Sequence, residues 1–395
     1  MNPTDSVLDW IIVGGGIHGT YLSNALIKKR VTCRDDLRVI DPHDEALTSW
    51  KNVTRNVGME YLRSPKVHHL DLESFSLKHY SQCSGCSERQ FIAPNDRPSL
   101  SLFNRHAESI INRNGLEKLR VKDWAIKIDP GAAYHTVHTG HDCFRTKNLI
   151  VATGSGSPEW PLWATNAMNE GAMVQHVLDP NYDARQLPVE GEIIVVGGGM
   201  SAVQTALSLS NEKRRVTLVS PHSLQMNNYD SDPGWMGPKY LRKFRSVSCF
   251  AKRRRLIDKA RNRGTVTPDI YHAFRNEVKK GKCLQVVDSI FSCAVLTEGL
   301  NLLQFQSDEK LACNGIVLAT GFRNRRPGGD LISKFVDQHN LKCASCGYPI
   351  PNSNLEWFDR IYLSGPLAEL EVGPAAQNVI GARMAAEKIL INHRN

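Results

Sequence analysis

Two glycine-rich segments constrain the fold of this chain more than any other feature of its sequence. Each follows a run of β-branched residues and leads into a helical pattern, and they occupy residues 14–19 and 197–202. Their spacings, G-x-G-x-x-G and G-x-G-x-x-A, bring backbone amides and a helix N-terminus close to a pyrophosphate. We therefore predict two dinucleotide sites, with these cofactor contacts: Gly14, Gly16, Ile17, His18 and Gly19 at the first, and Gly197, Gly199, Ser201 and Ala202 at the second.

The end of the next strand distinguishes the two sites. At the first site, a strand over residues 37–40 leads to Asp41, whose carboxylate suits the ribose hydroxyls of FAD or NAD. At the second site, the strand over residues 216–219 ends at Ser220, and Arg215 precedes it. A missing acid and a nearby cation favour a 2′-phosphate, so we predict NADPH with Arg215 as a contact. NADH, and a solvated Arg215, are the alternatives.

The length and composition are those of an ordinary globular protein. The 395 residues suggest two or three domains, with 23% charged and 41% hydrophobic residues. No apolar run is long enough to span a bilayer, and the first residues lack the basic region of a signal peptide. Ten cysteines are too few for a disulfide scaffold of this size, so we expect reduced thiols and a cytoplasmic protein.

The net charge of +9 raises the question of an anionic partner. The densest basic run covers residues 252–255, and no aromatic-interleaved or helix-turn-helix pattern accompanies it. We therefore do not expect nucleic-acid binding and favour a solvated helix face. A supporting role near an anionic cofactor or substrate is the alternative.

A second repeated feature marks crossings between structural units. Two strands are each followed by Ala-Thr-Gly, ending at Gly154 and at Gly321. A third strand ends at Gly365 and precedes a helix expected over about residues 375–391. We interpret these glycines as the ends of strands that close two similar α/β units.

Together these features resemble the flavoproteins with two dinucleotide-binding domains, over nearly the whole chain. Residues 319–322 resemble the ATG-aromatic signature of class B flavin-dependent monooxygenases, which include lysine and ornithine N-hydroxylases. Residues 59–64 are similar to the Met-x-Phe-Leu-Lys-Asp segment of those enzymes, and His68 and His69 follow them. The ending, residues 365–376, looks like that of relatives described only as FAD/NAD(P)-binding.

The resemblance implies an α/β fold with two Rossmann-like dinucleotide-binding domains, the NAD(P)-binding domain being inserted into a split FAD-binding domain. The expected ranges are 1–158 and 322–395 for the FAD-binding domain and 159–321 for the NAD(P)-binding domain. FAD is expected at the first site and NADPH at the second, with no metal. Further implied cofactor contacts are Trp50, Gly154, Gly321, Gly365 and Ala375.

The resemblance also implies a substrate contact and a reaction. Arg63 stands where the amino-acid hydroxylases have a Lys for the substrate carboxylate, and Ser64 replaces their Asp, which weakens the case for an amino-acid substrate. The implied activity is an NADPH-using monooxygenase. It forms a C4a-hydroperoxyflavin and oxygenates a small nucleophile containing nitrogen or sulfur, or a carbonyl.

Two other functions remain open: an NAD(P)H-dependent disulfide or other flavin reductase, and a non-catalytic FAD-binding redox sensor or scaffold. The chain has two C-x-x-C motifs, Cys83 with Cys86 and Cys343 with Cys346, but neither lies where disulfide reductases carry theirs. The four cysteines could also form a zinc site if the fold joined them. We favour unlinked cysteines. Neither the substrate nor the oligomeric state can be inferred from the sequence.

Overall fold

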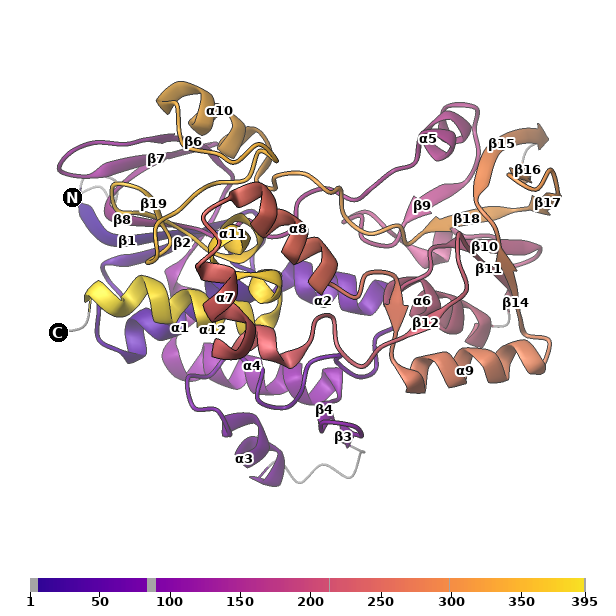
Figure 1. Ribbon diagram of the computed structural model, residues 1–395, viewed down its shortest axis with the longest axis horizontal. Coiled ribbons are helices and arrows are strands. Elements are labelled where there is room, and N and C mark those ends of the chain that lie inside the picture. Colours follow the sequence, from indigo (N-terminus) through magenta and orange to yellow (C-terminus); the bar gives the residue numbers. More distant parts are fainter. Residues whose placement is uncertain (1–5, 84–89, 213, 298, 394–395) are drawn as a thin grey trace.

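The fold consists of two parallel sheets that alternate with helices and lie side by side (Figure 1). The computed structural model describes residues 6–83, 90–212, 214–297 and 299–393. We call the part built on the sheet of the first fingerprint the first unit, and the part built on the other sheet the second unit. The predicted α/β fold with two Rossmann-like units is confirmed.

The first unit is built around a parallel sheet in the order β20-β8-β1-β2-β5. Its parallel strands are β1 (Val7–Val13), β2 (Leu37–Asp41), β5 (Arg120–Lys122), β8 (Cys143–Val151) and β20 (Ile361–Leu363). Three antiparallel strands extend it: β6 (Ala125–Asp129), β7 (His135–Thr139) and β19 (Glu356–Phe358). Since β20 pairs with β8, the C-terminal segment completes a sheet that the N-terminal segment begins.

The second unit has a five-stranded parallel sheet in the order β14-β11-β10-β18-β9. Its strands are β9 (Val174–His176), β10 (Glu192–Val196), β11 (Arg215–Ser220), β14 (Cys283–Val287) and β18 (Gly315–Leu318). Helices α6 (Met200–Asn211) and α9 (Pro268–Lys279) cover one face. The other face packs on α5 (Leu162–Asn169) and on an antiparallel sheet of β15 (Ile290–Thr297), β16 (Leu300–Phe305) and β17 (Lys310–Cys313).

The central strands β10 and β18 of the second unit are buried on both faces, because their residues are mainly apolar. In β10, Ile193 and Val195 join the core beneath α6 and α9, whereas Ile194 joins the core on the opposite face. Alternate side chains of a strand point to opposite faces, so a continuous β-branched run fits a sheet that is covered twice.

The helices of the first unit cover its sheet, and short elements complete the chain. The C-terminal helix α12 (Val379–Ile389) lies beside α1 (Ile17–Lys28), which follows the first fingerprint (Figure 1). The remaining helices are α2 (Thr48–Asn56), α3 (Ser76–Cys83), α4 (Leu100–Asn114), α7 (Pro238–Arg245), α8 (Phe250–Ala260), α10 (Gly329–His339) and α11 (Glu369–Val372). Two short strand pairs are β3 (Phe91–Ile92) with β4 (Arg97–Pro98) and β12 (Gln225–Met226) with β13 (Thr265–Val266).

The two crossings between the units run next to each other. Pro158 forms an isolated antiparallel bridge with Phe322, and the Glu159 amide donates to the Gly321 carbonyl at 2.9 Å. One segment does not follow the expected division: α7 and α8 fall within residues 159–321 but pack into the core of the first unit. Both helices therefore pack as part of the first unit, and α8 extends toward the second unit (Figure 1).

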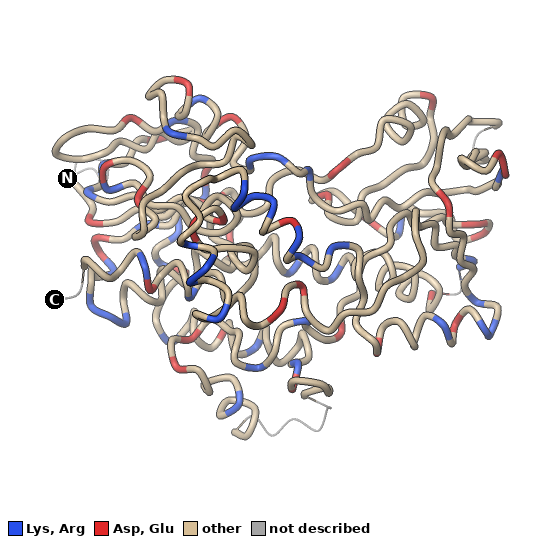
Figure 2. Tube along the Cα trace, viewed as in Figure 1, with Lys and Arg blue, Asp and Glu red and all other residues tan. Residues whose placement is uncertain are grey.

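The expectation of a solvated basic helix face at residues 252–255 is wrong for its two central residues. Arg253 is buried and pairs with Glu371 at 3.0 Å, and Arg254 pairs with the buried Glu369 at 2.5 Å. Only the flanking Lys252 and Arg255 are exposed, although Figure 2 shows cations gathered along α7 and α8. The basic run therefore attaches α8 to the acidic α11 of the first unit, because a buried guanidinium requires a counter-charge.

Candidate nucleotide-binding site

The first fingerprint forms a turn that only glycine fits. Gly14 has φ +108°, and a Cβ there would lie 2.3 Å from the Ala152 carbonyl oxygen. A Cβ at Gly19 would lie 1.8 Å from the Gly14 oxygen, so α1 and β1 pack at a distance that no side chain permits. Gly16, at the N-cap of α1, differs: no side chain caps the helix there, and a Cβ would meet nothing within 4 Å. The amides that begin α1 therefore face open space, as a pyrophosphate site requires.

Asp41 lies at the carboxyl end of β2, beside this turn. Its Oδ2 accepts a hydrogen bond from the Gly15 amide at 2.6 Å, and its Oδ1 accepts from the His43 amide at 3.0 Å. The guanidinium of Arg120 donates to Oδ1 at 3.2 Å and lies over Gly15. The carboxylate thus holds the turn, at the carboxyl end of β2 where a ribose contact was predicted. No local signal in the sequence pointed to Arg120, because it comes from β5.

The C-terminal segment closes on the first fingerprint. His18 forms hydrogen bonds through Nδ1 with Ser364 Oγ at 2.8 Å and through Nε2 with the Asn378 carbonyl at 3.2 Å. Burial lowers the pKa of His18 to about 4, so the ring is neutral. Two further predicted site residues belong to this segment. A Cβ on Gly365 would lie 3.8 Å from His18 Nδ1, and Ala375 lies in the 3₁₀ turn just before Asn378. The expected helix over residues 375–391 begins later, at Val379, because residues 374–377 form a 3₁₀ turn.

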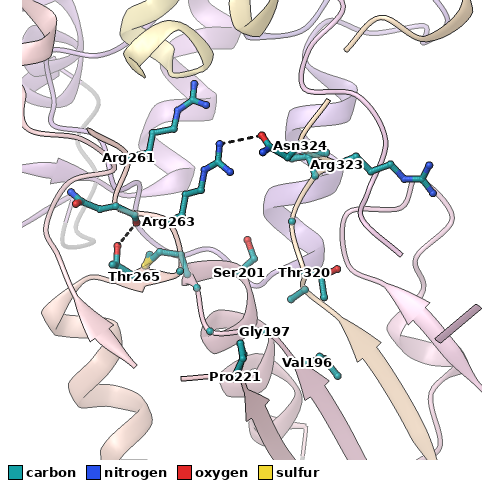
Figure 3. Close-up of a pocket in the computed structure, with 18 of the residues that line it drawn as sticks. Val196, Gly197, Ser201, Pro221, Arg261, Arg263, Thr265, Thr320, Arg323 and Asn324 are labelled. Atoms are coloured by element: carbon teal, nitrogen blue, oxygen red, sulfur yellow. Dashed lines mark hydrogen bonds between the residues drawn. The ribbon is translucent and has the colours of Figure 1, made fainter. Parts of the chain in front are cut away.

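The second fingerprint repeats the geometry and opens onto a pocket. Gly197 has φ +147°, and a Cβ there would lie 2.6 Å from the Ala319 oxygen. Gly199 is the N-cap of α6 and has no capping side chain. A pocket of about 690 Å³ lies above this turn, and Gly197, Gly199, Ser201 and Gly321 line it (Figure 3). The second turn and the uncapped N-terminus of α6 therefore open onto a cavity, as the prediction of a nucleotide site requires.

The pocket lies between the two units and is lined by cations. Pro366, Glu369 and Gln377 of the first unit contribute one wall. Arg261 and Arg263 extend into the space opposite the fingerprint turn, and Arg323 comes from the loop after Gly321 (Figure 3). Arg263 bonds Asp258 at 3.1 Å and Asn324 at 3.4 Å, whereas Arg261 pairs with the buried Glu369 at 2.5 Å. Arg263 and Arg323 give the pocket a charge suited to phosphates.

Arg63 reaches from the first unit to the pocket wall. Its Nη2 donates to the carbonyls of Asn227 and Tyr229, at 2.9 and 2.8 Å, and to Thr265 Oγ1 at 2.8 Å. Burial lowers the pKa of this guanidinium, and its Nε has no hydrogen-bond partner within the described part of the chain. The side chain therefore links the units at the site where a substrate contact was predicted.

Arg215 is wrong as a cofactor contact. It begins β11, opposite Glu192 at the start of β10, whereas the fingerprint turn follows the carboxyl end of β10. In a parallel sheet the nucleotide binds at the carboxyl ends of the strands, so Arg215 lies at the opposite edge. His222, just beyond the carboxyl end of β11, is the side chain that lies over the fingerprint turn instead. It follows Ser220, and its Cε1 would lie 2.9 Å from a Cβ on Gly198.

The remaining candidate residues are not among those that line the pocket. The Trp50 indole donates to Asn104 Oδ1 at 3.0 Å and packs 5.3 Å from Phe103. Cys83 is exposed, Cys86 lies outside the described residues, and Cys343 and Cys346 are partly buried. Among the described residues, no group of three or more His, Cys, Asp and Glu could hold a metal ion. The same residues include no helix with the length and apolar character needed to cross a membrane.

Comparisons with known proteins agree with this architecture. The chain is 22% identical over 320 residues to the uncharacterized oxidoreductase CzcO of Bacillus velezensis, covering 80% of this chain and 81% of that protein. Its fold is similar to that of the ornithine hydroxylase PvdA from Pseudomonas aeruginosa, with a TM-score of 0.75, 18% identity and coverage of 98% and 99%. It is also similar to the cadaverine monooxygenase DfoA from Erwinia amylovora, with a TM-score of 0.74, 15% identity and coverage of 98% and 95%.

At these identities the solved structures establish a shared fold. A sequence family matches more directly, over residues 8–244, a range that contains both fingerprints. The chain therefore belongs to the pyridine nucleotide-disulphide oxidoreductase family.

Proposed function

We propose that the protein is an FAD-dependent, NADPH-using oxidoreductase that acts as a monooxygenase on a small nucleophilic substrate. One observation carries the proposal: two helices, α1 and α6, begin at uncapped glycines of dinucleotide turns, and the C-terminal segment that contacts the first turn also lines the pocket above the second. Two nucleotides bound at these turns can meet between the units. The fold shared with PvdA and DfoA supports the reaction class.

The residues of the first turn fit FAD. The open space above Gly16 leaves room for a pyrophosphate, and Asp41 is placed for the adenosine ribose. When bound, the flavin would take hydride from the nicotinamide and pass electrons to oxygen. The chain itself would supply the amides of α1, the neutral ring of His18 that joins β20 to α12, and walls that exclude water. The uncapped N-terminus of α12 would stabilise negative charge on the reduced ring.

The main rival of this proposal is a disulfide reductase. A disulfide reductase needs a thiol pair within reach of the flavin. None of the described residues that line the pocket is a cysteine. We further propose that Arg63 contacts the substrate, that the substrate is a small molecule rather than a nucleic acid, and that the protein works in the cytoplasm.

Purified protein should release FAD on denaturation and consume oxygen when NADPH is added, with hydrogen peroxide accumulating if no substrate accepts the oxygen. A variant with serine at Cys83, Cys343 and Cys346 should show the same oxygen uptake under reducing conditions, because no thiol takes part. Oxygen electrode and flavin absorbance measurements test this. Protein that cannot be reconstituted with FAD, or turnover that needs a disulfide acceptor and is lost in the variant, would contradict the proposal.

The nucleotide preference is expected to depend on the carboxyl end of β11. No acid stands at Ser220 to repel a 2′-phosphate, and His222 lies over the fingerprint turn, so we infer that the His222 ring donates a hydrogen bond to that phosphate. His222→Ala should then raise the KM for NADPH about tenfold. The KM for NADH should change little. Arg215→Ala is the matched control and should alter neither value, because Arg215 lies at the other edge of the sheet. An Arg215 variant with the larger effect would reject this placement.

A further inference from the structure

Two cysteines that the proposed reaction does not use lie behind the wall of the pocket. Cys343 and Cys346 are separated by two residues in a tight turn, where the Gly347 amide donates to the Ala344 carbonyl at 2.8 Å. Cys343 forms an antiparallel bridge with Pro349. Burial is the main cause that raises the pKa of the Cys343 thiol, and charge interaction with Cys346 adds to it. The two cysteines therefore flank one tight turn, in the C-x-x-C spacing of redox-active pairs.

An arginine accompanies each of these sulfur atoms. Arg326 Nη1 lies 3.7 Å from Cys343 Sγ and also donates to the Gly347 carbonyl at 3.2 Å. The pKa of Arg254 is raised: burial lowers it, but the interactions with Glu369 and Cys346 outweigh that effect. Nε and Nη2 of Arg254 are buried without a hydrogen-bond partner in the described chain. Arg326 opposes the rise in the pKa of the Cys343 thiol that burial causes. A neighbouring cation of this kind stabilises the thiolate once it forms, and the thiolate is the form that reacts with oxidants.

The same arginine connects the turn to the pocket. Its guanidinium lies 4.1 Å from the centre of the Tyr348 ring, and it pairs with Glu369 at 2.5 Å. Both Tyr348 and Glu369 line the pocket. The Tyr348 hydroxyl also donates to the Arg325 carbonyl at 3.1 Å, next to Asn324 in the pocket wall. A change at the turn therefore reaches the wall directly, through Tyr348.

We propose that Cys343 and Cys346 are a peroxide-sensitive dithiol whose oxidation weakens pyridine nucleotide binding in the adjacent pocket. The Cys346 thiolate attacks one oxygen of hydrogen peroxide, forming a sulfenic acid and releasing hydroxide. The Cys343 sulfur then attacks the sulfenic sulfur, the S–S bond forms, and water leaves with the oxygen atom. The first hydroxide takes up the Cys343 proton, and the oxygen that leaves the sulfenic acid takes up the proton that Cys346 released on forming its thiolate. The two thiols together lose two electrons, and the peroxide becomes two waters.

The disulfide changes the pocket wall in two ways. It alters the Cys343 sulfur that accepts from Arg326, and it draws the turn at residues 343–347 together. The bond converts the two thiols beside Arg254 and Arg326 into a disulfide that cannot ionise, and it constrains the backbone that carries Tyr348. The inference rests on the proposed binding of NADPH in this pocket but not on the reaction that follows. Peroxide from any source would serve as the oxidant.

The test uses the full-length protein, reduced or treated with hydrogen peroxide, and titrates it with NADP⁺ by calorimetry. Peroxide should remove two hydrogens from the peptide that contains both cysteines and weaken NADP⁺ binding about tenfold, or 1.4 kcal/mol. Dithiothreitol should restore both the mass and the affinity. Cys343→Ser and Cys346→Ser should bind NADP⁺ as the reduced protein does, before and after peroxide. Cys249→Ser, which alters an exposed cysteine elsewhere, should respond as the unaltered protein does.

The possible failures are distinct. If the reduced protein does not bind NADP⁺, the proposed function fails and the switch fails with it. If the reduced protein binds NADP⁺ but the disulfide does not form, or forms without changing the affinity, the switch alone is rejected. Loss of affinity after peroxide in Cys343→Ser, to the same extent as in the unaltered protein, would also reject it.

Discussion

Gly16→Asp is expected to abolish FAD binding while the protein without flavin stays folded. Gly16 is the uncapped N-cap of α1, its φ of −76° suits any residue, and a side chain there meets open space. An aspartate can cap the helix, so the stability of the unliganded protein should be unchanged or higher by a few tenths of a kcal/mol. The same carboxylate would occupy and repel the pyrophosphate position, weakening FAD binding about 100-fold or more, which is about 2.8 kcal/mol.

The measurement is flavin content and FAD affinity, together with the thermal midpoint of the flavin-free protein. Gly237→Asp is the matched control, because Gly237 is the uncapped N-cap of α7, and a Cβ there also meets nothing within 4 Å. This helix does not follow a fingerprint strand, so the control should keep its flavin. Equal flavin retention in the two variants would show that FAD does not bind at the N-terminus of α1.

Glu369→Gln is expected to lower the free energy of unfolding by about 3–5 kcal/mol, because it removes one charged partner of a buried ion pair and leaves the other charge buried. Glu369 is 1% exposed and holds both Arg254 and Arg261 at 2.5 Å. Glutamine fills nearly the same volume but leaves two largely buried guanidinium groups without their counter-charge. The midpoint of urea unfolding should fall accordingly.

The control for this substitution is Asp44→Asn. Asp44 forms an exposed ion pair with Lys122 at 2.8 Å, with side chains 73% and 62% exposed. Exposed pairs contribute about 0–1 kcal/mol, so the control should unfold close to the unaltered protein. Similar midpoints for Glu369→Gln and the unaltered protein would mean that α8 and α11 are not held together by this charge.

The turn at residues 14–19 shows why part of the site could be predicted. Its positive φ at Gly14, its close helix packing at Gly19 and its open N-cap at Gly16 all arise within six consecutive residues. The β-branched runs before each turn likewise define buried parallel strands through their own apolar character. Local sequence therefore determined both dinucleotide turns and the α/β class.

The placement of Arg215 shows where the same reasoning failed. Arg215 was predicted to contact the phosphate because it stands just before the second strand of the fingerprint unit. It is the first residue of that strand, however, and the two ends of a strand lie at opposite edges of the sheet. Arg215 and His222 lie at opposite ends of the β11 segment, and only His222 faces Gly198. The direction of the strand, rather than the presence of a cation, decides which side chain can meet the nucleotide.

The sequence by itself determined two dinucleotide turns, the acid after the first and the two parallel units, because each depends on neighbouring residues. Only the tertiary structure decided the role of the basic run in α8, where Arg253 and Glu371 stand 118 residues apart in the chain and meet in a buried pair. It alone also placed Arg63 beside Thr265, across the junction of the units. Such pairs depend on how the elements pack, and neither partner carries a local signal for the other.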